Sequence, residues 1–302
     1  MSDDEKYRKF LLNALGRPLA RQAGLLARPG KVPPMVRECN GYFIDKGLTP
    51  ARREPRIRTL VLHYTATSLL RSLSALTNPA GDASAHYVVP ETADDDNRFV
   101  VYQLVPERQL ARHAGVSGWR GERLLNGTSI GVEIVNPGYP ADDARLPLMD
   151  RRWHPFPMPQ IAVVGRLVAD IVVRYGIAPD RVLGHADVAP GRTHDPGPRF
   201  PWRWLHEQFG VGAWPDDARV AHYRDHRPYR GDVPALQAKL LAYGFDTPQT
   251  GELDASTTDV IAAFQMHFHP ARYDGVPDVE TVAVLDALLE KYGETDRAMT
   301  AR

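Results

Sequence analysis

The chain has 302 residues, and its 37 Lys and Arg balance 37 Asp and Glu, so the formal net charge is zero. The length suits one good-sized domain with a smaller one beside it, and the 43% hydrophobic content is ordinary for a globular protein. The charge balance argues against nucleic acid as a partner, because there is no basic excess to neutralise phosphates. Cys39 is the only cysteine, which excludes an internal disulfide and a metal site built from several thiolates.

Residues 1–40 are predicted to form an N-terminal arm with one short helix over residues 7–15. Charged residues begin the chain, and Arg17, Arg21 and Arg28 interrupt its apolar runs, so neither a secretory signal nor a membrane span is predicted. Three explanations stay open: the protein acts where it is made, it leaves by a route the sequence does not reveal, or this sequence lacks its natural leader.

Residues 41–215 alternate between strand-like and helical patterns. The run RIRTLVLHYTAT predicts a buried strand that ends at His63, and SAHYVVP with FVVYQLVP predicts a hairpin with a polar tip. TSIGVEIVN predicts a strand that contains Glu133, and RVLGHADV predicts a short strand that ends at His185. Between them, QIAVVGRLVADIVVRYG carries apolar residues at helical spacing and stops at Gly176. This order indicates an α/β domain with a mixed central sheet and helices packed on it.

The pattern changes in the last third of the chain. Residues 216–231 are polar and charged and are predicted to form a linker. Over residues 232–295, apolar side chains recur at helical spacing in three stretches. This predicts a small all-α domain of three helices.

Metal-capable side chains gather where two of the predicted strands end. His63 and His185 both lie at carboxyl ends of strands, where side chains of an α/β domain converge on a shared cleft. Asp195 is the natural third ligand, since Pro196 and Gly197 fix the turn that carries it. Two histidines and one carboxylate meet the needs of a hydrolytic zinc site without a thiol. Taken alone, however, a histidine at a strand end is more often an ordinary surface or core residue.

Glu133 places a carboxylate inside a run of β-branched residues. A buried, unpaired carboxylate costs several kcal/mol, so it should be paired, be exposed at an edge, or take part in chemistry. A general base beside a metal-bound water would account for it. By strand alternation alone, a position on the solvent face is equally compatible with the sequence.

Five segments, in chain order, resemble a known family: VLHYTAT, SAHYVV, QLARHAGVSGW, NGTSIGVEIVN and GHADVAPGRTHDPGPRFPW. They are similar to the zinc-dependent N-acetylmuramoyl-L-alanine amidases of the peptidoglycan-recognition type, over about residues 40–215. The resemblance implies one Zn²⁺ per chain held by His63, His185 and Asp195, with Glu133 as the catalytic carboxylate. The tail resembles a peptidoglycan-binding helical module, so the pair is similar to two-domain envelope amidases and not to the single-domain cytosolic recycling enzyme.

One position departs from the family pattern. Where many close relatives carry a lysine that helps to stabilise the oxyanion, this sequence has Thr193, a neutral and weaker donor. Arg192 and His194 are candidates to compensate. Trp119 is a candidate to stack on a sugar or line the cleft, and equally a candidate core residue.

The other histidines are assigned no metal. His86 and His113 match family positions that are not ligands, and Asp187 is a candidate to orient a ligand imidazole. His267 and His269 lie two residues apart in the helical tail and would point to different helix faces, so they are interpreted as non-metal residues.

The predicted activity is zinc-assisted hydrolysis of the amide between N-acetylmuramic acid and L-alanine, with peptidoglycan or a muropeptide as partner. Two alternatives remain open at this point: a recognition protein that binds muropeptide without cutting it, and a metal-dependent peptidase acting within the stem peptide. The wall-binding tail favours the cell envelope or periplasm over a cytoplasmic recycling role. The sequence predicts no oligomeric state.

Overall fold

A computed structural model describes residues 36–39, 42–45 and 56–293 of the chain. The chain divides into two compact units, residues 1–54 and 55–302. In the first unit, β1 (Val36–Cys39) and β2 (Tyr42–Asp45) form an antiparallel pair. The short helix expected over residues 7–15 lies outside the described residues. The second unit begins about fourteen residues after the expected start of the catalytic domain at residue 41, so β2 belongs to the first unit.

The second unit is built on a mixed five-stranded sheet with the order β5-β4-β8-β3-β9. Its strands are β3 (Thr59–Tyr64), β4 (Tyr87–Val89), β5 (Tyr102–Gln103), β8 (Ser129–Ile134) and β9 (Val182–Gly184). Four neighbouring strands are parallel, and only β5 runs antiparallel to its neighbour β4. Consecutive residues Leu60, Val61 and Leu62 of β3 are all fully buried, as expected for a central strand covered on both faces. The predicted mixed sheet is confirmed.

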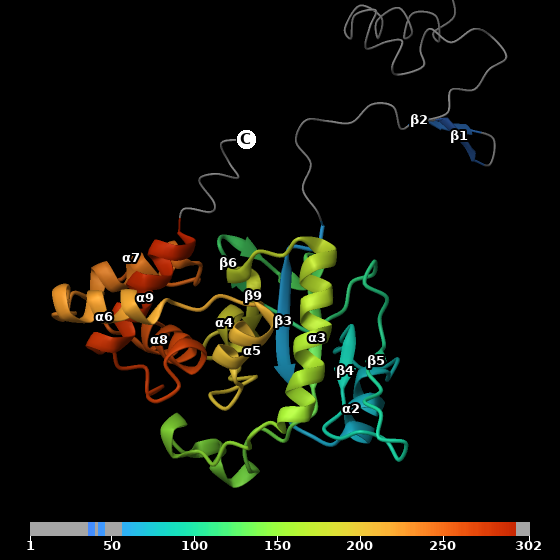
Figure 1. Ribbon diagram of the computed structural model, residues 1–302, viewed down its shortest axis with the longest axis horizontal. Coiled ribbons are helices and arrows are strands. Elements are labelled where there is room, and N and C mark those ends of the chain that lie inside the picture. Colours follow the sequence, from blue (N-terminus) through green and yellow to red (C-terminus); the bar gives the residue numbers. More distant parts are fainter. Residues whose placement is uncertain (1–35, 40–41, 46–55, 294–302) are drawn as a thin grey trace, which may run out of the picture. The chain divides into compact units, whose positions relative to one another are not determined.

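Helix α3 (Met158–Tyr175) lies over one face of this sheet (Figure 1). Its buried residues Ile161, Val164, Val168 and Ile171 recur at helical spacing, so one apolar stripe faces the strands. Gly176 ends the helix in the left-handed conformation, with φ of 65°.

Short elements connect these main parts. The helices are α2 (Leu69–Leu76), α4 (His185–Val188) and α5 (Trp202–Phe209), and β6 (Gly118–Trp119) pairs antiparallel with β7 (Glu122–Arg123). Single turns of 3₁₀ helix occur at Leu125–Gly127, Ala141–Arg145, Leu148–Asp150 and Pro179–Arg181.

The C-terminal part is all helical, as predicted: α7 (Val233–Tyr243), α8 (Ala255–Phe268) and α9 (Val279–Tyr292). Each of these helices begins at an aspartate whose carboxylate accepts a hydrogen bond from the backbone N–H three residues on, namely Asp232, Asp254 and Asp278. Such a cap satisfies one of the unpaired N–H groups at the helix start. The core between the helices is formed by large buried side chains that include Phe264, Leu285 and Leu288.

The segment expected to be a linker, residues 216–231, contains a helix, α6 (Asp217–His226), which packs against α9. Its polar sequence gives no apolar stripe, and Val220 is its one buried residue. Ion pairs tie the segment to α9 instead: Arg219 with Glu290 at 2.7 Å, Lys291 with Asp216 at 2.7 Å and Arg224 with Glu280 at 3.6 Å. The helix therefore depends on tertiary contacts that the sequence pattern does not show.

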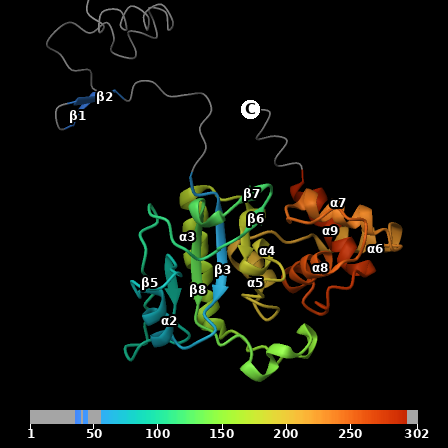
Figure 2. The ribbon, with the colours of Figure 1, turned by 180° about the vertical axis from the view of Figure 1, so that it is seen from behind.

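The helical part packs directly on the sheet domain, with α8 against α4 and α5 (Figure 2). One hydrophobic cluster joins Val61 and Leu183 of the sheet to Phe245 and Phe264 of the helical part. Within the described residues, every helix is too short or too polar to cross a bilayer.

Candidate active site

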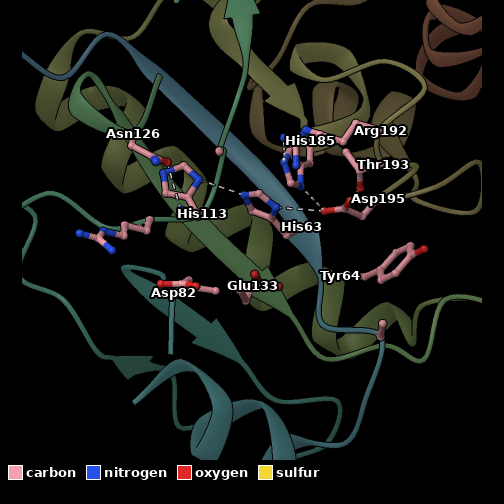
Figure 3. A pocket seen from close by; sticks show the side chains of 14 residues that line it. His63, Tyr64, Asp82, His113, Asn126, Glu133, His185, Arg192, Thr193 and Asp195 are labelled. Carbon is pink, nitrogen blue, oxygen red and sulfur yellow. Dashed lines mark hydrogen bonds and ion pairs between the residues drawn. The ribbon is translucent and has the colours of Figure 1, made fainter. Parts of the chain in front are cut away.

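A pocket of about 610 Å³ opens where the parallel strands β8, β3 and β9 reach their carboxyl ends. This edge is where ligands bind in open α/β sheets. His63, Glu133, His185, Thr193 and Asp195, all predicted as site residues, line this pocket (Figure 3).

The three predicted metal ligands converge because of strand register. Leu62 of β3 pairs with Gly184 of β9, so the next residues, His63 and His185, lie side by side. Asp195 reaches them from the following loop, and its Oδ2 lies 3.0 Å from His63 Nδ1 and 3.2 Å from His185 Nδ1. One ligand atom from each residue lies within 4.8 Å of the other two. Two imidazole nitrogens and one carboxylate oxygen are a donor set that fits zinc.

The electrostatics of this group suit a cation. Burial, reinforced by the neighbouring His185, lowers the pKa of His63 to about 4, so its imidazole is neutral at pH 7. Burial opposes ionisation of Asp195, but the neighbouring His185 and His63 hold the pKa of this carboxyl well below its usual range. A neutral His63 beside an ionised Asp195 matches the protonation states that metal binding requires of these two residues.

A chain of hydrogen bonds behind His63 fixes which of its nitrogens carries the proton. The Ser129 hydroxyl donates to the Leu125 carbonyl at 2.6 Å, so it accepts from His113 Nε2 at 3.1 Å. His113 Nδ1 is then an acceptor, and His63 Nε2 donates to it at 3.0 Å. The lone pair of His63 Nδ1 is left facing Asp195 and the pocket. A Cβ on Gly131 would meet the His113 ring at 2.3 Å, so only glycine fits beneath this imidazole.

The His185 ring is held on both sides. Its Nε2 lies 3.0 Å from Arg192 Nη2 and 3.2 Å from the Ala114 carbonyl oxygen, and its Nδ1 faces Asp195 Oδ2 at 3.2 Å. Arg192 donates to the same carbonyl at 2.6 Å and lines the pocket. Of the two residues expected to compensate for the missing lysine, Arg192 is therefore at the pocket, whereas His194 borders a separate small cavity.

Glu133 lies beside His63 because the two are direct partners across β8 and β3. Its Oε2 is buried and has no hydrogen-bond partner among the residues that the structure describes. Burial raises the pKa of Glu133 well above its usual range, and the nearby Asp195 charge adds to the effect. An unpartnered carboxylate in a pocket with a raised pKa is a typical general-base candidate.

The Thr193 hydroxyl points toward Asp195, one of the three candidate metal ligands. It donates a hydrogen bond to Asp195 Oδ1. The Thr193 proton is thus engaged by the carboxylate, so this side chain holds Asp195 in place and is not free to donate to an oxyanion.

The prediction that Trp119 binds substrate is wrong. The side chain is 1% exposed, and it packs edge-on against Tyr243 and Phe245 with ring centroids 5.8 and 4.9 Å away. Its Nε1 donates to the Asp180 carbonyl at 3.0 Å. Trp119 therefore fills the boundary between the sheet domain and the helical part, which is the core role that its sequence context also allowed.

Asp187 does not orient a ligand imidazole. Its carboxylate contacts His267 and the backbone of Gly184, at 2.7 Å in each case. His86 is structural, because its Nδ1 accepts from the Gly131 N–H at 3.0 Å and its Nε2 donates to the Gln109 carbonyl at 3.2 Å.

Several pocket residues with polar side chains were not identified from the sequence: Tyr64, Asp82, Arg112 and Asn126. Asn126 accepts from the backbone N–H groups of His113 and Ala114, at 3.0 and 2.7 Å, and so supports the segment behind His63. Tyr64 follows His63 directly, and that adjacency was the available signal. Nothing in the sequence marks Asp82 or Arg112, which reach the pocket from loops.

Each of the two parts of the chain matches a known protein family. Residues 53–198 match the N-acetylmuramoyl-L-alanine amidase family, and residues 229–285 match a putative peptidoglycan-binding domain. The amidase AmiD of Escherichia coli K12 is 43% identical over 262 residues, covering 85% of this chain and 91% of AmiD.

Solved structures give the same relationship. E. coli AmiD in complex with the substrate anhydro-N-acetylmuramic acid-L-Ala-D-gamma-Glu-L-Lys superposes with a TM-score of 0.78 at 42% identity, covering 86% of this chain and 98% of that one. AmpDh3 from Pseudomonas aeruginosa, in complex with anhydromuramic pentapeptide, superposes with a TM-score of 0.72 at 41% identity, covering 84% and 98%.

The fold, the pocket and these comparisons define an amide hydrolase with a candidate metal centre and a helical domain that matches a putative peptidoglycan-binding domain. The chain belongs to the N-acetylmuramoyl-L-alanine amidase family, as its sequence motifs predicted. It is an enzyme that hydrolyses the amide between N-acetylmuramic acid and L-alanine.

Proposed function

We propose that this amidase is zinc-dependent, with one Zn²⁺ held by His63 Nδ1, His185 Nδ1 and a carboxylate oxygen of Asp195. The observation that carries the proposal is the meeting of this three-ligand group with the unpartnered Glu133 carboxylate in one pocket. A bound zinc ion would polarise the scissile carbonyl and lower the pKa of its water.

Proton transfer and the positioning of the ligands are carried out by the protein's own side chains. Glu133 Oε2 has an open lone pair and a raised pKa, so it accepts the proton of the attacking water and returns it to the leaving amine of L-alanine. His113 holds His63 in the tautomer that leaves Nδ1 unprotonated, and Thr193 holds Asp195. The Arg192 guanidinium supplies positive charge at the pocket wall, in place of the lysine of many relatives.

The substrate class follows from the relatives and from the second domain. The AmiD and AmpDh3 structures contain anhydromuramyl peptides, and residues 229–285 match a peptidoglycan-binding domain. We assign peptidoglycan and its muropeptide fragments as substrates, with the helical domain raising the local concentration of polymer by tethering. A wall-binding domain also favours action in the cell envelope over a cytoplasmic recycling role.

The experiment that tests this proposal is product analysis. Peptidoglycan and a purified anhydromuramyl peptide are incubated with the protein after chelation and again after Zn²⁺ is restored, and the products are examined by mass spectrometry. Free stem peptides that begin at L-alanine, released only with zinc, are the expected result. Cleavage inside the stem peptide would instead support a peptidase, and binding without cleavage would support a recognition protein.

A further inference from the structure

A second histidine–aspartate pair lies outside the pocket, at the boundary between the two domains. His267 of α8 donates from Nδ1 to Asp187 Oδ2 of α4 at 2.7 Å. Each side chain is only 2% exposed. The pair joins the helical domain to the element that begins with His185.

Asp187 connects this pair to the metal ligands through the backbone. Its Oδ2 also accepts from the Gly184 N–H at 2.7 Å, which fixes the turn immediately before His185. Within the same turn, the Ala186 N–H donates to the carbonyl of Asp195 at 2.8 Å. Two of the three proposed ligands therefore depend on the position of the segment that Asp187 holds.

The His267 ring has little freedom to move. It stacks between Trp202 and Phe268, with centroids 3.8 and 3.9 Å away and interplanar angles of 15° and 9°. A cavity of about 10 Å³ lies beside the pair. Such a space holds one water at most. A rotation of His267 would thus move α4 with it.

A second contact from α8 reaches the same loop. Gly191, at φ of 74°, lies against Asp259, and a Cβ there would meet the Asp259 carboxylate at 2.2 Å. Helix α8 is therefore closely fitted to the ligand-bearing loop at two points, His267 and Asp259. A domain that served only as a tether would need neither contact.

We propose that the helical domain is part of the catalytic framework, and that His267 is a positioning residue that sets the metal-binding segment 184–195 through Asp187. Hydrolysis of a small soluble muropeptide then depends on the helical domain, even though no polymer is available to be tethered. This inference rests on the proposed assignment of His185 and Asp195 as zinc ligands. Loss of a partner that orients a metal site typically weakens metal affinity or activity about 10–100-fold.

The test compares three variants of the full-length protein. His267→Phe keeps a stacking ring but removes the donor to Asp187, whereas His267→Asn keeps an N–H near the position of Nδ1 but loses the ring. His269→Phe is the matched control, because His269 is at the end of the same helix and pairs only loosely with Asp278 at 3.8 Å. Zinc affinity is measured by competition with a chelator, kcat and KM are measured on an anhydromuramyl tripeptide, and thermal unfolding is followed in parallel.

We expect His267→Phe to weaken zinc binding and to lower kcat, each about 10–100-fold, with KM little changed. We expect His267→Asn to recover part of both losses although it is the less stable variant, and His269→Phe to match wild type. The visible absorption of the cobalt-substituted protein should change in His267→Phe, because ligand geometry is altered.

Two results would overturn the inference. The first is wild-type zinc affinity and kcat in His267→Phe, with only its unfolding temperature reduced. The second is an equal loss in the Phe and Asn variants, which would assign the effect to a disrupted interface. Failure of the proposed function is a separate outcome, because wild type itself would then bind no zinc or His63→Ala would bind it normally.

Discussion

Residues 184–202 supply the aspartates of two buried histidine–aspartate arrangements with opposite surroundings. The group of His63, His185 and Asp195 borders a pocket of about 610 Å³, whereas the pair of Asp187 and His267 borders a cavity of about 10 Å³. The side chains are of the same types in both places. Available space therefore decides their use: the open arrangement can take an ion and a substrate, and the closed one can only hold two domains together.

Each arrangement has one buried polar atom without a hydrogen-bond partner among the described residues, Glu133 Oε2 beside the open one and His267 Nε2 in the closed one. The Glu133 atom belongs to a carboxylate that lines the large pocket and whose pKa is raised by burial. The His267 atom belongs to a ring that is held by Asp187 and borders only the small cavity. An unpartnered atom is therefore a sign of reactivity only where a substrate has room to reach it, although a buried group normally finds a hydrogen bond.

The largest effect should come from Glu133→Gln, which removes the proposed base and leaves both arrangements intact. We expect kcat to fall by about 10²–10⁴-fold, the range typical of general-base catalysis, with zinc content unchanged. Product analysis and metal analysis of the same sample check this. Retention of more than a tenth of the wild-type kcat would exclude Glu133 as the base.

His113→Phe should act on the open arrangement alone. The variant removes the acceptor that sets the His63 tautomer, so zinc affinity should fall about 10–100-fold, as measured by chelator competition. Ser129→Ala, one hydrogen bond further out, should weaken zinc binding less. Equal effects of the two variants would contradict the conclusion that this chain of hydrogen bonds sets the His63 tautomer.

Thr193→Val should have a smaller effect on the same group. The hydroxyl donates to Asp195 Oδ1, and one such hydrogen bond is worth about 0.5–1.5 kcal/mol, so we expect kcat to fall roughly 2–10-fold. Steady-state kinetics on a soluble anhydromuramyl peptide measure it. A loss above a hundredfold would mean that Thr193 contacts the reacting atoms.

Glu107→Gln should change stability without changing kcat, because Glu107 lies away from both arrangements. Its carboxylate accepts from Tyr87, Arg174 and Tyr175 at 2.8, 2.5 and 2.8 Å. Burial opposes ionisation, but these hydrogen bonds, led by the one from Arg174, lower the pKa of Glu107 below its usual 4.5. The stabilisation is therefore complete above the unfolded pKa and is lost as pH falls through the lower folded value.

We accordingly expect Glu107→Gln to reduce the free energy of unfolding by about 1–3 kcal/mol at pH 7 and by much less near pH 3. Denaturant unfolding at the two pH values measures the difference. An equal loss at both would show that the charge of Glu107 is not what stabilises the fold.

Much of the site could be predicted from the sequence because the ends of strands can be recognised in it. An apolar run that stops at a histidine predicts that this histidine lies near the carboxyl end of a strand. This was correct for His63 in β3 and for His185, which follows β9. Helix α6 could not be predicted, since Val220 is its only buried residue and its contacts are with α9, which lies far along the chain. Trp119 could not be assigned either, because a buried core ring and a sugar platform have the same local sequence.

By itself, the sequence determined the mixed sheet, the three helices of the tail and the position of two histidines at strand ends, because these follow from local periodicity. Only the tertiary structure decided the partner of Asp187, which is 80 residues away in α8. It also decided the direction of the Thr193 hydroxyl and the size of each cavity. These depend on how two domains dock, and docking is set by side-chain packing across the interface, which no local pattern encodes.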